Sequence, residues 1–225
     1  QFATYAGMAA QKFPWIQFYT PINEPLTTAR FSGLYGIWYP HKKNDRDFTL
    51  ILLNQMKAIV LAMKAIRKIN PNAKLLQTED LAKTYSTPLL KYQADFENER
   101  RWLTYDILCG RLKAGHRLWK YFQGLRIPEK LFYFFVDNPC PPDVIGADHY
   151  LTSERFLDEN LKQYSFLLFA NTNNDVFDTD EQRLAFRRYI ESGGGFVGLH
   201  SVLGTERNWA WFKMMLGGSF AWHPK

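Results

Sequence analysis

The sequence Thr20-Pro21-Ile22-Asn23-Glu24-Pro25 marks the point where the first predicted strand of this 225-residue chain ends. Residues 15–20 predict that strand, and the two prolines stop it. A glutamate at a strand end suits a general acid or base, and an asparagine before it suits a hydrogen bond to a sugar 2-hydroxyl. For Asn23-Glu24-Pro25 taken alone, a capped turn is the simpler interpretation.

Strands and helices alternate on both sides of this stretch. Helices are predicted at residues 1–12, 97–112 and 48–69, the last with Asp47 as its N-cap and apolar residues recurring every three and four positions. Residues 26–44 predict a loop, and two shorter helices are expected between residues 115 and 136. Strands are predicted at residues 74–78 and 144–150. Polar pairs collect at the strand ends, where parallel α/β proteins assemble their sites: Asn23-Glu24, Glu79-Asp80 and His149-Tyr150.

The remaining sequence predicts two more strands, at residues 164–170 and 196–200, and a tryptophan-rich helix at 208–216. A helix at 180–192 has Asp178 or Thr179 as its cap, and Glu181 or Gln182 can complete a capping box. We therefore expect an α/β fold with about five parallel strands and flanking helices. Right-handed crossovers would let these strands share one sheet. Because open sheet edges associate, we also expect a homo-oligomer or edges covered by loops.

Composition excludes several classes of protein. Hydrophobic residues make up 46% of the chain, enough for a packed core, and the net charge of +6 is spread without a long basic run. We therefore expect no nucleic-acid partner. Cys109 and Cys140 are not in metal-ligand spacing, which favours a reducing, cytoplasmic location. We expect no membrane span, because no apolar run approaches about 20 residues. The start at Gln1 resembles the middle of a helix, so we expect a longer parent sequence.

Residues 1–160 resemble glycoside hydrolase family 1, and especially a bacterial family-1-like branch. The resemblance rests on these motifs: Phe13-Pro14-Trp15, Asn23-Glu24-Pro25, Gly33-Leu34-Tyr35-Gly36, Trp38-Tyr39-Pro40-His41, Leu53-Asn54-Gln55-Met56-Lys57-Ala58, Gln77-Thr78-Glu79-Asp80, Arg101-Trp102-Leu103-Thr104-Tyr105-Asp106 and Gly146-Ala147-Asp148-His149-Tyr150. It implies strands four to six of a TIM barrel, with Glu24 as the catalytic acid/base. It also implies that Asn23 contacts the 2-hydroxyl and that Tyr150 lies near the nucleophile, while Trp38 and Tyr39 are candidate sugar-binding rings.

The departure from that family concerns the second carboxylate. A retaining glycosidase needs two carboxyl groups about 5–5.5 Å apart. In the family the nucleophilic glutamate ends the seventh strand, but here the strand at residues 164–170 is followed by Asn171-Thr172-Asn173-Asn174-Asp175. Glu79, Asp80 or Asp148 would have to replace it. We therefore expect weak turnover or none.

Residues 161–225 resemble ThuA-like (trehalose-utilisation) proteins, which have a flavodoxin-like fold. The shared motifs are Leu161-Lys162-Gln163-Tyr164, Phe169-Ala170-Asn171-Thr172, Gly193-Gly194-Gly195-Phe196-Val197-Gly198-Leu199-His200, Trp209-Ala210-Trp211-Phe212 and His223-Pro224. His200 follows a strand at an elbow-like turn, and with His223 it offers two ligands for a metal or a sugar hydroxyl. Because zinc sites need three or four protein ligands, we expect neither a metal nor a cofactor.

The sequence thus predicts a partial TIM barrel, residues 1–160, joined to a flavodoxin-like fragment, residues 161–225. A natural recombination, a deliberate fusion and a composite all fit such a chimera. The leading functional interpretation is a glycoside hydrolase relative with a sugar or glycoside ligand. Two alternatives remain open: a non-catalytic carbohydrate-binding module, and a structural α/β fragment without enzymatic activity.

Overall fold

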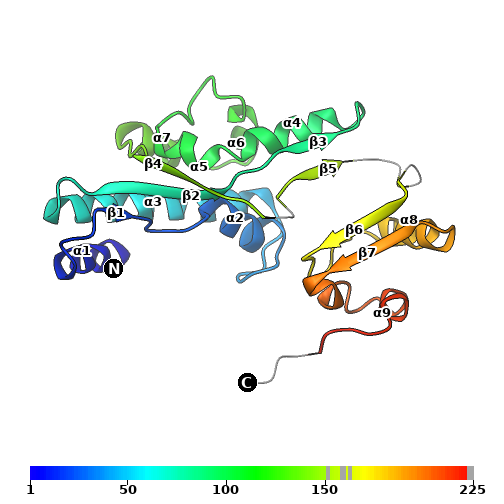
Figure 1. Ribbon diagram of the computed structural model, residues 1–225. Helices are drawn as coiled ribbons and strands as arrows, with labels where there is room; N and C mark the ends of the chain where they lie inside the picture. Colours follow the sequence, from blue (N-terminus) through cyan, green and yellow to red (C-terminus); the bar gives the residue numbers. More distant parts are fainter. Residues whose placement is uncertain (151–152, 158–160, 162–163, 222–225) are drawn as a thin grey trace. The chain divides into compact units, whose positions relative to one another are not determined.

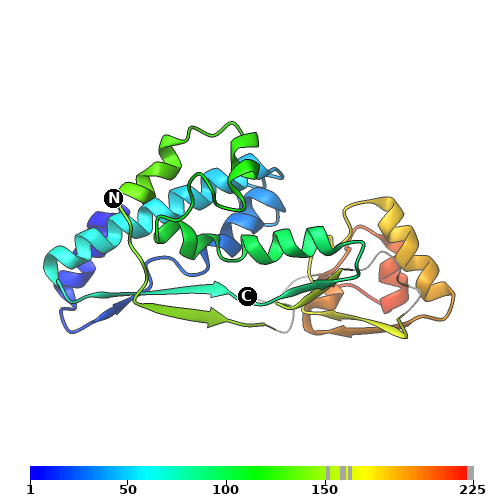
Figure 2. The same ribbon diagram turned by 90° about the horizontal axis from the view of Figure 1, so that it is seen from above.

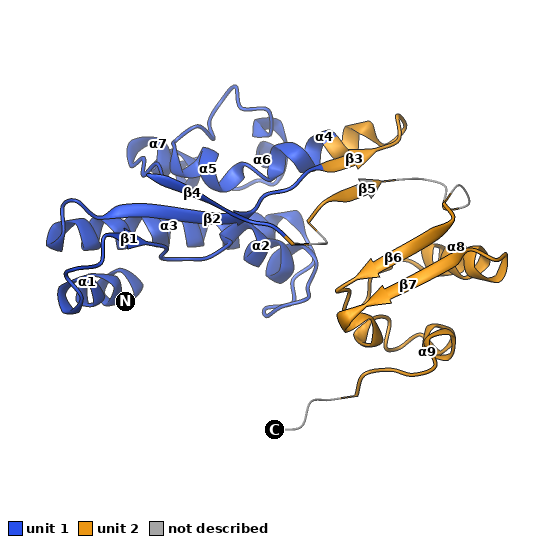
Figure 3. Cartoon of the chain, in the orientation of Figure 1, with its two compact units in different colours: residues 1–83, 95–149 blue, residues 84–94, 150–225 orange. Residues whose placement is uncertain are grey.

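The computed structural model describes residues 1–150, 153–157, 161 and 164–221 (Figure 1). The chain divides into two compact units, one formed by residues 1–83 and 95–149, the other by residues 84–94 and 150–225 (Figure 3). Each unit has a hydrophobic core of its own. The division into segments 1–160 and 161–225 stays a prediction.

The first unit is built on a three-stranded parallel sheet in the order β1-β2-β4. Its strands are β1 (Phe18–Tyr19), β2 (Lys74–Asp80) and β4 (Val144–Asp148). The helices of this unit lie on one side of the sheet (Figure 2). Side chains in β2 alternate accordingly: Leu75, Gln77 and Glu79 are buried, and the residues between them are half-buried. The strand extends two residues beyond the predicted 74–78, which places Glu79 and Asp80 within the sheet.

The helices of the first unit are α1 (Phe2–Lys12), α2 (Pro25–Ala29), the π-helical turn η1 (Arg30–Leu34), α3 (Asp45–Ile69), α4 (Lys91–Arg100), α5 (Leu103–Leu108), α6 (Trp119–Gly124) and α7 (Lys130–Asp137). The start of α4, up to Ala94, belongs to the second unit. Three predictions were wrong in detail. The loop at 26–44 begins with two helical turns, the helix at 97–112 is two shorter ones, and Asn44, not Asp47, caps α3. The Asn44 side chain accepts a hydrogen bond from the Asp47 amide at 2.8 Å, which places Asp47 one turn inside the helix.

Helix α3 forms the centre of the first core. Its buried face includes Phe48, Leu52, Met56, Ile59 and Met63, which are all fully buried and recur every three or four positions, as the sequence predicts. By length and composition α3 is the one helix among the described residues that would suffice to cross a membrane. Half of its most apolar stretch is buried inside the protein, and a helix of a protein core can have the same length and composition. The expectation of no membrane span stays a prediction.

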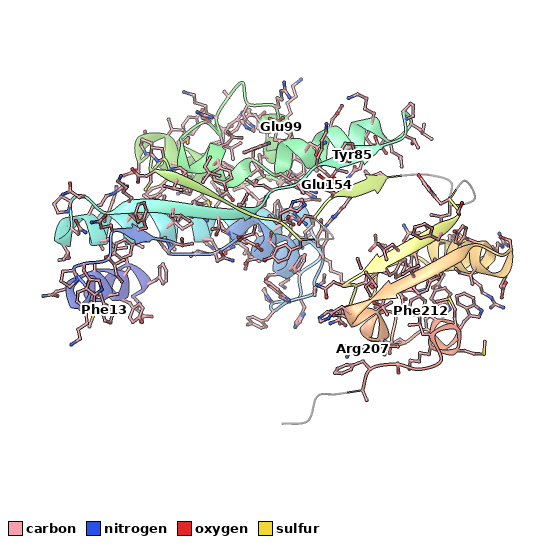
Figure 4. All side chains as sticks on the ribbon, viewed as in Figure 1. Phe13, Tyr85, Glu99, Glu154, Arg207 and Phe212 are labelled. Carbon is pink, nitrogen blue, oxygen red and sulfur yellow. The ribbon has the colours of Figure 1, made fainter. Side chains whose placement is uncertain are left out.

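The second unit contains two separate two-stranded parallel sheets. One pairs β3 (Thr84–Ser86) with β5 (Arg155–Leu157), and the other pairs β6 (Phe166–Ala170) with β7 (Gly195–Leu199). Helices α8 (Asp180–Glu191) and α9 (Ala210–Leu216) lie on one side of β6 and β7, and Phe186 and Phe212 are fully buried there (Figures 2 and 4). The 3₁₀-helix η3 (His200–Gly204) directly follows β7.

All five predicted strands are parallel to their neighbours, and the α/β class is confirmed. The expectation of one shared sheet was wrong, because β6 and β7 pair only with each other in the described part of the chain. Two short strands, β3 and β5, were not predicted. The capping box is confirmed in one of its forms: Thr179 accepts from the Gln182 amide, and Gln182 accepts from the Thr179 amide.

Candidate functional site

The turn after β1 has an unusual backbone at Glu24. This residue has a φ of 42°, in the left-handed region that non-glycine residues seldom adopt, and it is only 9% exposed. It is the N-cap of α2, with Pro25 at the favoured first helical position, but its side chain makes no capping hydrogen bond. The simple capped turn therefore does not account for the choice of glutamate here.

Consecutive residues of β2 hold this turn in place. The Thr20 hydroxyl donates a hydrogen bond to the Leu76 carbonyl at 2.8 Å, and the side-chain amide nitrogen of Gln77 donates to the Ile22 carbonyl at 3.0 Å. Thr78 donates its hydroxyl to Asn23 Oδ1 at 2.6 Å. Asn23 is exposed, and no described residue forms a hydrogen bond with its amide nitrogen.

Glu79 secures the far end of the same turn. Its Oε1 accepts the Leu26 amide at 2.8 Å and the hydroxyl of Thr104 from α5, while Oε2 has no hydrogen-bond partner among the described residues. The side chain is 1% exposed. Burial raises its pKa to about 7, the two hydrogen bonds oppose that rise, and the negative charge of Glu24 adds to it. Glu79 and Glu24 are therefore electrostatically coupled.

The direction of the Glu79 side chain decides what it can do. Alternation along β2 places Glu79 with Leu75 and Gln77, toward the helices, whereas Thr78 contacts Asn23 on the opposite face. The sequence predicts that a sugar contacts Asn23, so a nucleophile would have to reach the face of the sheet on which Asn23 lies. Glu79 instead bonds α2 and α5, so the geometry makes it a positioning residue for the turn. Asp80 and Asp148 are register partners in β2 and β4, and a role for either as a replacement nucleophile stays a prediction.

The two predicted sugar-binding rings lie in the loop that follows η1. Trp38 is 47% exposed and packs edge-on against Phe31 at 5.0 Å between ring centroids. Tyr39 is 84% exposed and lies edge-on to His41 at 6.3 Å. The loop is tied down by hydrogen bonds from Lys42 and Asn44 amides to the carbonyls of η1. Both rings are therefore accessible, but their part in sugar binding stays a prediction.

Tyr150 and His200 belong to the second unit. Tyr150 is half exposed, and its amide donates to the Ser153 hydroxyl at 2.8 Å. His200 begins η3 with a φ of 54°, so the predicted elbow-like turn after β7 is present. Within the described residues no three histidine, cysteine or acidic side chains are close enough to hold a metal ion. His223 lies outside the described residues, so the expectation about a metal stays a prediction.

Two comparisons with known proteins give matches. The profile of the ThuA family, described as trehalose utilisation, matches residues 143–225, beginning earlier than the resemblance at 161. The structure is similar to a β-glucosidase from Thermotoga maritima in complex with azafagomine, with a TM-score of 0.60, 16% identity and 70% of this chain covered. The structure of a family 1 β-glucosidase from Thermotoga maritima gives a TM-score of 0.58 at the same identity and coverage. No match is found among curated protein sequences.

These matches define the fold, not the activity. The chain spans about a third of the length of the glucosidases, 35% in both cases. It thus combines part of a family 1 glucosidase fold with a segment that the ThuA profile matches, as the sequence predicted, and no closed barrel is formed by the described strands.

Sequence reasoning missed the supporting residues of the site. Gln77 and Glu79 were noted only as part of a motif and as a nucleophile candidate, yet they hold the Glu24 turn. The signal was available: in a strand of period two, both fall on the face of the buried Leu75. A carboxylate and an amide on the buried face of a strand are expected to form hydrogen bonds with neighbouring segments.

Proposed function

We propose that this chain binds a sugar or glycoside at the Asn23-Glu24-Pro25 turn and hydrolyses it weakly or not at all. The observation that carries the proposal is the hold of β2 on that turn. Four consecutive β2 residues bond Thr20, Ile22, Asn23 and Leu26, which lie on both sides of Glu24. These bonds restrain the backbone of Glu24, and Asn23 itself is exposed. Such support for a polar turn is what an orienting site requires, because a group held in position loses little entropy on binding.

The weak turnover follows from the second carboxylate. General acid assistance alone contributes about 10²–10⁴-fold, whereas a covalent intermediate divides the reaction into two easier steps. The carboxylate coupled to Glu24 is Glu79, and it is buried, hydrogen-bonded to α2 and α5, and on the helix-facing side of β2. It supports the general acid without supplying a nucleophile to the substrate face.

The similarity to glucosidase complexes suggests a probe. One of the similar Thermotoga maritima structures is described as a complex with deoxynojirimycin. We expect deoxynojirimycin to bind this chain weakly in isothermal titration calorimetry. Asn23→Ala should weaken the binding about tenfold, the value for one polar hydrogen bond. Glu24→Gln should also weaken it, because the ligand is cationic. Glu181→Gln, an exposed change on α8, is the matched control.

Turnover is tested separately, with an activated aryl β-glucoside under single-turnover conditions. We expect no burst of phenol. A burst with a glycosyl adduct trapped on Asp80 or Asp148 would show that the chain is a retaining glycosidase after all. Absence of deoxynojirimycin binding to the wild-type chain would instead favour the structural-fragment alternative.

A further inference from the structure

The second unit contains a cavity that the sugar site does not explain. It has a volume of about 310 Å³ and lies in the loops that follow the carboxyl ends of β6 and β7. In parallel α/β sheets, ligands bind in the crevice outside the carboxyl ends of the strands. The volume is at the lower end of the range for small-molecule sites, roughly 300–1,000 Å³. All of the residues lining it belong to the second unit.

The lining of this cavity carries a surplus of hydrogen-bond donors. Asn173, His200, Ser201 and Arg207 line it together with Phe220, and none of the described lining residues is acidic. Arg207 directs Nε to the Gly204 carbonyl at 3.0 Å and Nη2 to Asn173 Oδ1 at 3.1 Å. These bonds leave Arg207 Nη1 and the Asn173 amide nitrogen without hydrogen bonds to described residues. A guanidinium and an amide, fixed side by side with no carboxylate, suit the oxygen atoms of an anion.

Gly204 makes this arrangement possible. A Cβ at this position would lie 2.3 Å from Asn173 Oδ1 and 3.1 Å from Arg207 Nη2. Any larger residue would therefore displace the Asn173–Arg207 pair. The Phe220 ring adds an apolar wall, with the Arg207 guanidinium 5.8 Å from its centroid. The cavity thus combines a cationic end with an aromatic face, which fits an organic anion better than a bare ion.

Several hydrogen bonds hold the loops that frame the cavity. Asn171, Asn174, His200 and Glu206 all have φ between 48° and 61° in the loops after β6 and β7, a backbone that other contacts must hold. Glu206 is fully buried, and it accepts the Val176 and Phe177 amides at 2.7 and 3.0 Å and Arg183 Nε at 2.7 Å. The Asn174 amide also donates to the Gly204 carbonyl at 3.0 Å. Little reorganisation is needed before a ligand binds.

We propose that this cavity binds a small organic anion, a carboxylate or phosphate group on a skeleton the size of a monosaccharide. The anionic group contacts Arg207 and Asn173, and the remainder of the ligand lies against Phe220. The site is distinct from the Glu24 turn and does not depend on the function proposed there. It gives the second unit a binding activity of its own.

The test compares three probes on the full chain by calorimetry: glucuronate, glucose 6-phosphate and glucose. We expect both anions to bind at least tenfold more tightly than glucose, and the tighter of the two identifies the anionic group. Arg207→Gln should weaken anion binding about tenfold or more, as for loss of a charged hydrogen bond. Arg188→Gln, which removes an exposed arginine of α8, is the matched control and should leave affinity unchanged.

Two further variants keep the result interpretable if Arg207→Gln loses stability. Gly204→Ala retains Arg207 but should weaken anion binding because its methyl group displaces Asn173. His200→Asn keeps a residue that tolerates the left-handed backbone and isolates the contribution of the imidazole. Equal affinity for glucose and glucuronate, or unchanged anion affinity in folded Arg207→Gln and Gly204→Ala, would overturn the proposal. Deoxynojirimycin binding by these variants reports the Glu24 site separately.

Discussion

Each of the two units buries a glutamate, Glu79 in the first and Glu206 in the second, and the two differ in how their oxygens are hydrogen-bonded. Glu206 in the second unit accepts hydrogen bonds on both oxygens, including one from the cationic Arg183. Glu79 in the first unit is bonded on Oε1 only, and its Oε2 has no hydrogen bond to described residues. A buried carboxylate must be compensated or protonated. The hydrogen bonds of Glu206 fix a loop, whereas burial raises the pKa of Glu79 to about 7.

The two glutamates therefore differ in what they influence: Glu206 holds a loop, and Glu79 also acts on the charge of the candidate site. Glu206 holds a loop that surrounds a cavity and does not line it. Glu79 holds the Glu24 turn but is also coupled to Glu24 by charge, so its protonation state affects the site it supports. The first unit is thus expected to respond to pH through its turn, and the second to depend on one ion pair.

The largest expected effect is the pH dependence caused by Glu79. Its folded-state pKa is raised from 4.5 to about 7, so between these values the folded chain holds a proton that the unfolded chain releases. Raising the pH through this window therefore lowers the free energy of unfolding, by an amount on the order of 3 kcal/mol. The stabilisation is complete below about pH 4.5 and lost above about pH 7. Glu79→Gln should remove this component.

The measurement is urea unfolding of wild type and Glu79→Gln from pH 4.5 to 8, with amide hydrogen exchange to follow each unit separately. Other groups titrate in both proteins, so the difference between the two profiles isolates Glu79. Glu181→Gln is the control and should keep the wild-type profile. Parallel profiles for wild type and Glu79→Gln would show that Glu79 is ionised in the folded chain throughout.

The second effect concerns Glu206. Glu206→Gln keeps the side-chain volume but removes the charge that Arg183 contacts at 2.7 Å, with the Glu206 side chain 1% exposed. We expect a loss of about 2 kcal/mol in the free energy of unfolding of the second unit, the range for a charged hydrogen bond. Glu191→Gln breaks an exposed ion pair with Arg187 on α8 and should cost no more than about 0.5 kcal/mol. Equal losses in both variants would mean that burial does not strengthen the Glu206 contact.

Periodicity predicted the fold well where a segment is long or strongly patterned. Helix α3 was found because its apolar residues recur every three and four positions along one buried face. Strand β6 was found because it is a short apolar run, and its Leu167 and Phe169 pack against the second core. The shortest strands were not predicted from the sequence. Strand β3 and strand β5 are held by pairing with each other across about 70 residues of sequence, and three residues carry no period.

The candidate site was predictable only in part. The Asn23-Glu24-Pro25 motif pointed to the turn, and alternation along β2 would have placed Glu79 on the helix side. The left-handed backbone of Glu24 was not foreseen, because it depends on bonds from β2 that no local pattern encodes. The cavity in the second unit depends on Gly204 and on Arg207, four and seven residues after His200, and on Asn173 from another loop. Such convergence is set by the sheet and not by neighbouring sequence.

A smaller effect compares the helix caps of the two units. Thr179→Ala removes one bond of the capping box of α8, and Asn44→Ala removes the cap of α3. Each should lower the free energy of unfolding of its unit by about 1 kcal/mol. Thr179→Ser, which keeps the hydroxyl, should restore most of the loss in α8. Urea unfolding of each variant measures these changes. No loss in Thr179→Ala would indicate that water replaces the cap without cost.

The smallest expected effect is the most informative about the Glu24 turn. Because the negative charge of Glu24 raises the pKa of Glu79, Glu24→Gln should lower that pKa. Thr104→Val should act in the opposite direction, because the Thr104 hydroxyl bonds the ionised form and holds the pKa down. Carboxyl carbon NMR titration of Glu79 measures both shifts, with Glu181→Gln as the control. Opposite shifts in the two variants would establish that Glu79 carries both the anchoring bond and the coupling to Glu24. An unchanged midpoint in Glu24→Gln would mean that the Glu24 carboxylate points away from β2, and Glu79 would then be an anchor of the backbone alone.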